Sequence, residues 1–412
     1  MRILERLLLR HFLSIRDVLL LYYTTLIDQI KGTARMDTYQ VNAGTTRLSP
    51  GRRRVLYIQP GTAVFAGIER VVDTVCAGLA ERFSGEFEID VLYTTGHDYR
   101  PPCPKYNVIE VRPRGRLQLM LMFRKVIKSK DYDLVVVPQI EPAVIAMASC
   151  LGLPRKFAIH LHGNPRREKS HLKARILFLL MRRYFLHRAS YVFGTSSKQL
   201  ASFQEMFPSK IPQKWLPNPV RRFEGADNGN RDPEHVTFVN VGRFSFQKGQ
   251  DILLEAFAEL VKQRPQARLK MVGHGIGDRD LRKQIQRLSI EAVVQVERHP
   301  IDPQPALAAS DVYVSTSRWE GWSLAICEAL RFGLPVISTD CEFGPSEILI
   351  EDRLGRLVSK TGGSSLVDAM IYYCDNLDAE KQHDHFRKDY VDRFSEEKIV
   401  KIHAEALLLA SK

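Results

Sequence analysis

Two glutamates, Glu320 and Glu328, bracket a short tract that joins a predicted strand to a predicted helix. The strand covers residues 312–317 and the helix covers residues 322–332, so the tract lies at the carboxyl end of a strand. In open α/β sheets, ligands bind in the crevice at this end of the strands. Two carboxylates there can accept hydrogen bonds from a polar ligand. Taken alone, a helix with one glutamate near its start and another on its surface would explain the pair equally well.

The start of the predicted helix could also bind an anion. Its first residues are Trp322, Ser323 and Leu324, and the first N–H groups of a helix have no partner within it. These N–H groups and the positive end of the helix dipole favour an anion such as a diphosphate. Glu328 lies roughly 9 Å further along the helix axis. A diphosphate at the helix start would therefore have a ribose on one side and a second group near Glu320 on the other.

A second tract of the same kind carries two basic residues. Residues 236–242 form a predicted buried strand, residues 250–263 form a predicted amphipathic helix, and Arg243 and Lys248 lie in the loop between them. A guanidinium together with an ammonium is the usual means of neutralising a diphosphate. Each residue singly would be explained as a solvated loop charge, but both in one strand-to-helix loop indicate a phosphate site.

These tracts and several others resemble a known family. The motifs in the second half of the chain are Val241-Gly-Arg243, Lys248-Gly249, Val272-Gly-His-Gly275, Glu320-Gly321, Glu328-Ala329 and Gly333-Leu-Pro-Val-Ile337. They resemble the donor half of the family 4 glycosyltransferases, which are retaining enzymes with the two-domain GT-B architecture. Gly344-Pro-Ser-Glu347-Ile348 resembles a variant frequent in members that build bacterial surface glycans.

The resemblance extends into the first half of the chain through residues 66–71, 160–163 and 216–220, and it covers roughly residues 52 to 409. It implies an α/β fold of two Rossmann-like, doubly wound parallel-sheet domains that face each other across a cleft. The sequence departs from the family at Ala66, where a glycine is usual, and at Trp322, where another aromatic residue is usual. These departures leave the identity of the donor open.

The resemblance implies how these residues would act on a nucleoside diphosphate sugar. Arg243, Lys248 and the helix start would stabilise the leaving diphosphate, where negative charge develops. Glu328 would accept hydrogen bonds from the ribose hydroxyls, and Glu320 would bind hydroxyls of the transferred sugar. Attack is expected on the same face as the leaving phosphate, which helps to deprotonate the acceptor. No dedicated base is therefore predicted.

Two residues of the first half complete the predicted site. His162 follows a predicted strand over residues 157–161, and the resemblance puts it close to the transferred sugar. Gly67 begins the helix after the first strand, where the missing Cβ would let backbone N–H groups approach a phosphate, although turn geometry would also explain it. The predicted catalytic residues are Glu320, His162, Arg243 and Lys248, and the predicted nucleotide-binding residues are Gly67, Arg243, Lys248, Trp322, Ser323, Leu324 and Glu328.

No metal site and no disulfide framework are predicted. Asp131-Tyr-Asp133 and Asp278-Arg-Asp280 have the spacing that glycosyltransferases of another architecture use to hold a divalent cation, but each lies at a predicted element boundary. The six cysteines show no paired spacing, which argues against a disulfide scaffold or a zinc site and favours a reducing compartment. We therefore expect no cofactor and no required metal, with the nucleotide diphosphate sugar as donor substrate.

Positive charge is concentrated in the first half of the chain. Residues 1–220 contain 34 Lys and Arg against 17 Asp and Glu, whereas residues 221–412 contain 26 against 30. A predicted basic helix over residues 166–188 contributes much of this excess, and its Arg166 and Arg167 are candidates for binding an acceptor phosphate. A solvated helix would account for these charges, but their interleaving with apolar residues favours an anionic membrane surface or a diphosphate-linked lipid acceptor. Nucleic acid is not expected as a partner, because no recognition motif is present.

Predicted strands and helices alternate twice along the chain, which is typical of two parallel sheets covered by helices. No apolar run reaches the length of about eighteen residues that spans a bilayer, and residues 1–30 lack a signal-peptide cleavage site. We expect a cytoplasmic protein, peripheral at the cytoplasmic face of the inner membrane. The predicted order is an amphipathic extension over residues 1–50, an acceptor-binding domain over 51–220, a linker over 221–235, a donor-binding domain over 236–395, and a helix over 396–412 that crosses back to the first domain.

Three functional hypotheses follow. The leading one is a retaining, metal-independent hexosyltransferase that uses a nucleotide diphosphate sugar, with a UDP-sugar favoured. Its acceptor would be lipid-linked or a polysaccharide, in the synthesis of a cell-surface glycan such as lipopolysaccharide, O-antigen or capsule. The second is an α-mannosyltransferase that uses GDP-mannose. The third is a nucleotide- or glycan-binding protein of the same fold that has lost turnover, and the intact set of candidate residues argues against it.

Overall fold

The computed structural model describes residues 51–59, 61, 67–96, 104–169, 171–223, 231–298 and 302–412. The predicted N-terminal extension over residues 1–50 lies outside the described residues, as do residues 224–230 of the predicted linker.

In the first half of the described chain, seven parallel strands form one sheet in the order β3-β2-β1-β4-β5-β6-β7. The central strands β4 and β5, apolar apart from His160, are buried along their whole length, as expected where helices cover both faces of a parallel sheet. The strands are β1 (Arg53–Ile58), β2 (Phe87–Tyr93), β3 (Asn107–Glu110), β4 (Leu134–Pro138), β5 (Phe157–Leu161), β6 (Ala189–Gly194) and β7 (Gln213–Trp215).

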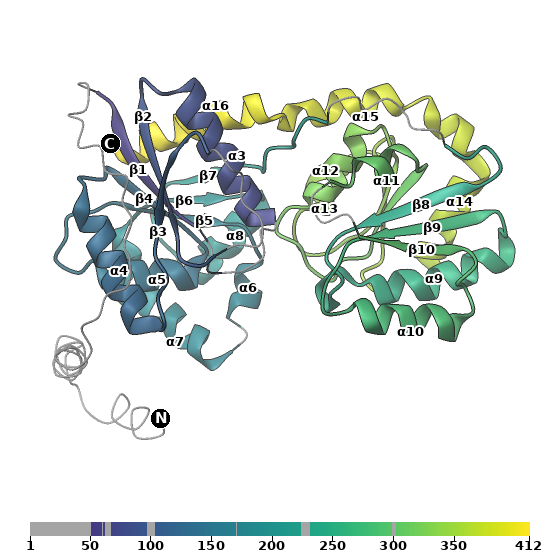
Figure 1. Cartoon of the computed structure of the whole chain (residues 1–412), viewed down its shortest axis with the longest axis horizontal. Helices are drawn as coiled ribbons and strands as arrows, with labels where there is room; N and C mark the ends of the chain where they lie inside the picture. Colours follow the sequence, from purple (N-terminus) through teal and green to yellow (C-terminus); the bar gives the residue numbers. More distant parts are fainter. Residues whose placement is uncertain are drawn as a thin grey trace. The chain divides into compact units, whose positions relative to one another are not determined.

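Helices cover both faces of this sheet (Figure 1). One face packs against α4, α5, α7 and α8, whereas α3 and the C-terminal helix α16 pack against the other face. The helical segments of this half are α3 (Gly67–Arg82), α4 (Arg116–Ser129), α5 (Ile140–Ser149), α6 (Pro165–Glu168), α7 (Leu172–Leu180), the π-helical turn η1 (Met181–Phe185), the 3₁₀ turn η2 (Leu186–Arg188) and α8 (Ser197–Met206).

The prediction of one basic helix over residues 166–188 is wrong, because the segment contains two separate helix starts. The side chain of Asn164 accepts hydrogen bonds from the N–H groups of Arg166 and Arg167 and begins the short helix α6. Nδ1 of His171 accepts a hydrogen bond of 3.1 Å from the N–H of Ala174 and begins α7. Side chains that cap a helix in this way satisfy N–H groups that have no partner inside the helix.

The second half of the described chain contains a six-stranded parallel sheet in the order β10-β9-β8-β11-β12-β13. The strands are β8 (Val236–Val241), β9 (Ala267–Val272), β10 (Val294–Glu297), β11 (Val312–Ser315), β12 (Val336–Thr339) and β13 (Gly355–Val358). Around them lie η3 (Phe246–Lys248), α9 (Gln250–Gln263), α10 (Asp278–Leu288), α11 (Gln304–Ala308), α12 (Leu324–Arg331), α13 (Pro345–Ile348), α14 (Gly363–Lys381), α15 (Asp384–Val391) and η4 (Asp392–Phe394).

The order of this sheet reverses between β8 and β11, which are neighbours in the sheet but far apart in the sequence. The loops that leave the carboxyl ends of two such strands diverge, and the crevice between them is the usual ligand site of an open α/β sheet. The loops after β8 and β11 carry the predicted residues Lys248 and Glu320. The topology thus places the two predicted tracts side by side.

The last helix, α16 (Glu396–Ser411), packs against the first sheet. Its Val400 lies so close to α3 that a Cβ on Gly78 would come within 2.7 Å of Val400 Cγ2. Ser190 Oγ in β6 donates a hydrogen bond of 3.5 Å to the carbonyl oxygen of Ala410. None of the helices in the described ranges is both long enough and apolar enough to cross a lipid bilayer.

Candidate active site at the carboxyl ends of β8 and β11

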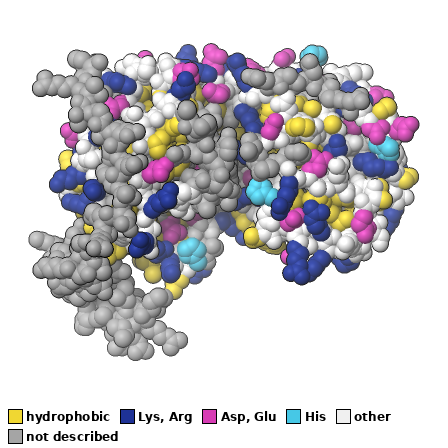
Figure 2. Space-filling view, viewed as in Figure 1, with side chains coloured by type: hydrophobic (Ala, Val, Ile, Leu, Met, Phe, Trp, Pro, Cys, Tyr) yellow, Lys and Arg dark blue, Asp and Glu magenta, His cyan; other side chains and the backbone are white. Residues whose placement is uncertain are grey.

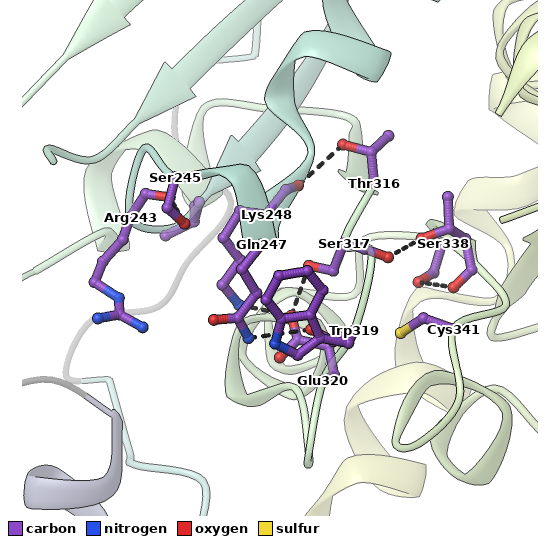
Figure 3. A network of polar contacts seen from close by, with 12 residues as sticks. Arg243, Ser245, Gln247, Lys248, Thr316, Ser317, Trp319, Glu320, Ser338 and Cys341 are labelled. Carbon is purple, nitrogen blue, oxygen red and sulfur yellow. Dashed lines mark hydrogen bonds and ion pairs between the residues drawn. The ribbon is translucent and has the colours of Figure 1, made fainter. Parts of the chain in front are cut away.

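A buried ion pair joins the two loops at the reversal point of the second sheet. Lys248 Nζ lies 2.6 Å from Glu320 Oε1, and Ser317 Oγ donates a hydrogen bond of 2.6 Å to the same oxygen (Figure 3). Glu320 is buried and Lys248 is partly buried. The pair places an ammonium and a carboxylate at the crevice where a polar ligand would bind. An anionic ligand could compete with the Glu320 carboxylate for the Lys248 ammonium.

Backbone contacts fix the two loops against each other. Gly249 has φ +63°, and a Cβ there would lie 2.1 Å from the carbonyl oxygen of Thr316, so only glycine fits. Thr316 Oγ1 donates a hydrogen bond of 2.8 Å to the carbonyl oxygen of Gly249. Gln247 Nε2 donates one of 3.1 Å to the carbonyl oxygen of Trp319. These contacts fix the backbone on either side of Lys248.

Arg243, the second basic residue of the predicted phosphate site, does not join this network. Its carbonyl oxygen accepts a hydrogen bond of 3.0 Å from Gln250 Nε2, which fixes the backbone of the loop. Its side chain is exposed and extends away from the Lys248–Glu320 pair (Figure 3). Its guanidinium pairs with no other side chain in the part of the chain that the structure describes.

The helix after β11 begins at Leu324, two residues later than predicted, so Trp322 and Ser323 precede it. Within the described residues no side chain caps this end, and the first N–H groups of the helix stay available to a ligand. Ser323 is buried, and the ring of Trp322 packs edge-on against Phe394 with centroids 5.1 Å apart. The side chain of Trp322 is therefore part of the core, and only its backbone can contact a ligand.

Glu328, the fifth residue of α12, is buried and paired with Arg221 of the predicted linker. Arg221 Nε lies 2.9 Å from Glu328 Oε1. Burial raises the pKa of the Glu328 carboxyl above its ordinary value, although the charges of Arg221 and Arg70 act in the opposite direction. Arg221 was not predicted, since nothing in a polar linker indicates which of its charges will meet a buried carboxylate.

His162 follows β5 and is buried, and neither ring nitrogen has a hydrogen-bond partner among the described residues. Burial lowers the pKa of its imidazole to about 3. Its ring lies 4.0 Å from that of His160, which lies 5.6 Å from the ring of His403 on α16. His403 was not predicted, because a histidine on the buried face of a helix carries no signal of its partner. A buried ring with both nitrogens unpaired is costly, and a ligand that supplied a partner would remove that cost.

The loop that carries Glu320 also touches His162. A Cβ on Gly321 would lie 1.9 Å from the carbonyl oxygen of His162 and 2.8 Å from Gln199 Nε2. Gln199 Nε2 in turn donates a hydrogen bond of 2.7 Å to the carbonyl oxygen of Gly163. The absence of a side chain at Gly321 therefore permits the close approach of the loop that carries Glu320 to the backbone of His162.

The remaining predicted residues occupy the first half. Gly67 is the exposed first residue of α3, and a Cβ there would meet no atom within 4 Å, so packing does not explain the glycine. Arg166 is paired with two carboxylates, through Nη1 to Glu342 at 2.5 Å and through Nη2 to Glu205 at 2.6 Å. No group of three His, Cys, Asp or Glu side chains in the described ranges is arranged to hold a metal ion. The expectation that no metal is required stays a prediction.

Two family models match most of the chain. Residues 66–219 match the model described as Glycosyl transferase 4-like domain. Residues 223–389 match the model described as Glycosyl transferases group 1. The first match contains most of the first sheet, and the second contains the whole second sheet with Lys248, Glu320 and Glu328.

Individual proteins are similar over shorter stretches. An uncharacterized glycosyltransferase from Methanocaldococcus jannaschii is 30% identical over 206 residues, which are 47% of this chain and 50% of the relative. The lipopolysaccharide core biosynthesis mannosyltransferase LpsB from Rhizobium meliloti is 23% identical over 205 residues, 47% of this chain and 58% of the relative. The chain thus spans about half the length of these curated relatives. Among solved structures, Anabaena HepE in complex with UDP has a TM-score of 0.70 at 21% identity, covering 86% of this chain and 99% of that chain.

Proposed function

Because the chain belongs to the family 4-like glycosyltransferases of the GT-B fold, we propose that it is a hexosyltransferase that takes a hexose from a nucleotide diphosphate sugar. The acceptor is a lipid-linked or polysaccharide acceptor of a bacterial cell-surface glycan, and the anomeric configuration is retained. The main support for this proposal is the Lys248–Glu320 ion pair at the point where the strand order of the second sheet reverses.

A UDP-sugar is the favoured donor. The similarity in fold to Anabaena HepE, which was solved with UDP, supports UDP. The similarity to the Rhizobium mannosyltransferase keeps GDP-mannose as the alternative, since its name assigns it a mannosyl donor. The cell-surface glycan as product is supported by the same relative, whose name refers to the lipopolysaccharide core.

The proposed reaction exchanges one bond at the anomeric carbon. The bond from this carbon to the phosphate oxygen breaks, the acceptor hydroxyl oxygen forms the new bond on the same face, and the hydroxyl proton passes to the leaving phosphate oxygen. Negative charge develops on the diphosphate, where Lys248 and the open N–H groups of α12 can stabilise it. Arg243 would join them once its exposed side chain turns toward the ligand. These groups supply the positive charge that a metal ion would otherwise provide.

Glu320, His162 and Glu328 would bind the two ends of the donor. When the diphosphate takes over the Lys248 ammonium, the Glu320 carboxylate becomes available to the hydroxyls of the transferred sugar. The ring nitrogens of His162, which have no partner among the described residues, could bond a hydroxyl of that sugar. Glu328 would accept hydrogen bonds from the ribose, and the charge of Arg221 favours the ionised form of its buried carboxyl.

The replacement Glu320→Ala tests this assignment. It should abolish transfer of the sugar and largely preserve the affinity for UDP, because Lys248 and the start of α12 remain. Glu351→Ala is the matched control, since Glu351 pairs with Arg353 outside the site. Transfer by the Glu320→Ala protein at the rate of the wild type would show that the carboxylate is wrongly placed. If the wild-type protein binds UDP or GDP but transfers no sugar, the alternative of an inactive binding protein holds.

We also propose that the protein works at the cytoplasmic face of the inner membrane, held by its basic first half. Lys and Arg side chains appear on the visible face of this half (Figure 2). Helix α7 adds an apolar stripe, because Leu172, Ile176 and Leu179 are exposed by 51%, 47% and 65%. An apolar stripe between basic residues is typical of a helix that lies on an anionic lipid surface.

Flotation with phosphatidylglycerol vesicles tests the membrane contact. The wild type should float with these vesicles and not with phosphatidylcholine vesicles. The double replacement of Ile176 and Leu179 by Ser should prevent flotation without changing the affinity for UDP. Leu409→Ser, at an exposed position of α16, is the control. Equal flotation of all proteins would contradict a role for α7.

A further inference from the structure

Two aromatic side chains lie at the edge of the candidate active site, in the loops that carry Lys248 and Glu320. They belong to no hydrophobic cluster of the described residues. Phe246 of η3 is exposed by 70%, and Trp319, which directly precedes Glu320, is half-buried. Their ring centroids lie 6.1 Å apart with an interplanar angle of 55°. We call Phe246 and Trp319 the aromatic rim. Exposed aromatic surface beside a polar site needs an explanation, because burial in the core would be more favourable.

The rim is held in place by its neighbours. The Arg318 guanidinium lies over the Phe246 ring at 4.0 Å, and Asp251 fixes this guanidinium with bonds of 2.8 and 2.6 Å. Arg318 Nη1 also donates a hydrogen bond of 2.7 Å to the carbonyl oxygen of Phe246. The backbone of Trp319 is bonded to Gln247, and Figure 3 shows Trp319 beside Gln247, Lys248 and Glu320. The two rings are thus preorganised and not loose surface side chains.

The position of the rim along the site limits what it can bind. Trp319 is adjacent to Glu320, the proposed partner of the transferred sugar. Glu328, the proposed partner of the ribose, lies within α12, so the nucleobase belongs at the other end of the donor. The Arg167 side chain of the first half reaches the Trp319 ring, with its guanidinium carbon 4.8 Å from the centroid. The rim therefore faces the acceptor-binding half at the reacting end of the donor.

The geometry points to an acceptor subsite, and we propose that Phe246 and Trp319 bind a pyranose ring of a glycan acceptor next to the transferred hexose. One face of a pyranose presents C–H groups with a partial positive charge, and these pack on the negative face of an aromatic ring. The exposed face of Phe246 and the side of Trp319 that Arg167 now covers provide such surfaces. Arg167 leaves the ring when the acceptor enters, and its charge is then available to an anionic substituent. This inference rests on the proposed glycosyl transfer and assigns the chemistry of its acceptor.

Saturation-transfer NMR on the full chain with saturating UDP tests the rim directly. The probes are the methyl α-glycosides of glucose, galactose and mannose. At least one should receive saturation mainly on the C–H groups of one ring face. Trp319→Ala and Phe246→Ala should each weaken its binding by about tenfold, whereas Trp319→Phe should keep most of the signal because it keeps a ring. Leu409→Ala, which removes an exposed apolar side chain on α16, should change nothing.

The outcomes separate this inference from the proposed function. If no glycoside binds, or if Trp319→Ala binds the glycoside as tightly as the wild type, the acceptor subsite is refuted. If Trp319→Ala lowers the affinity for UDP and leaves glycoside binding unchanged, the rim belongs to the donor site. If the wild type binds neither UDP nor GDP, the proposed donor site is refuted instead, and the glycoside signal still reports on the rim.

Discussion

The stack of three buried histidines predicts that the first half loses stability in acid. His162 and His403 have pKa values that burial lowers to about 3, and burial and the neighbouring rings hold the pKa of His160 well below its ordinary value. In an unfolded chain a histidine has a pKa of about 6.5. Between these values the unfolded chain binds protons that the folded chain does not bind, so the free energy of unfolding falls as the pH falls from 6.5 toward 3.

The magnitude follows from the width of this window. At pH 6.5 half of the unfolded histidine is already protonated, so each such histidine removes about 2.3 kcal/mol between pH 6.5 and pH 4.5, and His162 and His403 together remove about 4.6 kcal/mol. This loss is comparable with the whole stability of many domains. The replacement His403→Phe keeps a ring in the stack and removes one titrating group. The variant should therefore lose about 2.3 kcal/mol less than the wild type over the same interval.

Urea unfolding at pH 6.5 and pH 4.5 measures this difference. Comparing the pH dependence of the two proteins cancels the contribution of other groups, such as Glu168, whose pKa burial raises to about 8. His187→Gln, at an exposed position of η2, is the control and should behave as the wild type. If His403→Phe and the wild type lose the same free energy, or if NMR shows His162 or His403 titrating near pH 6.5, the reasoning is refuted.

Three further predictions concern the site. Gly321→Ala would place a methyl group 1.9 Å from the carbonyl oxygen of His162, so it should lower the rate of transfer by about 100-fold in an initial-rate assay while UDP still binds. Arg221→Leu should lower the thermal stability by about 3 kcal/mol, because it removes the ion-pair partner of buried Glu328, and Arg222→Leu at an exposed position should not. Transfer should continue at the same rate in EDTA, and loss of activity that Mg²⁺ or Mn²⁺ restores would contradict the metal-independent mechanism.

The fold class could be predicted because the central strands are distinctive. β4, β5 and β8 are near-continuous apolar runs, and in a chain that alternates with helices such runs indicate parallel strands covered on both faces. The predicted GT-B fold is confirmed by the two parallel sheets and by the likeness to solved structures. The edge strands β3 and β7 were not predicted, since they are short and partly exposed, and such strands have weak apolar patterns.

The contact between Lys248 and Glu320 in the candidate site was predictable, because both residues lie in loops that follow buried strands. Lys248 and Glu320 each follow a buried strand, and the order of strands in the sheet brings them together. Arg221 and His403 could not be found in this way, because their partners are Glu328 and His160, far away in the sequence. Only the folded chain shows these contacts. For Arg243 the motif alone was misleading. The residue was predicted beside Lys248, but its side chain makes no contact in the network around the Lys248–Glu320 pair (Figure 3).

The proposed donor site depends above all on Lys248 and the start of α12, which we propose bind the diphosphate of the donor. Calorimetric titration of the full chain with UDP and GDP in EDTA tests it most directly. We expect that one of them binds without metal, that Lys248→Glu weakens this binding by at least about tenfold, and that Lys262→Glu on the surface of α9 does not. Binding that is as tight in the Lys248→Glu protein as in the wild type, or no binding of either diphosphate, would contradict it.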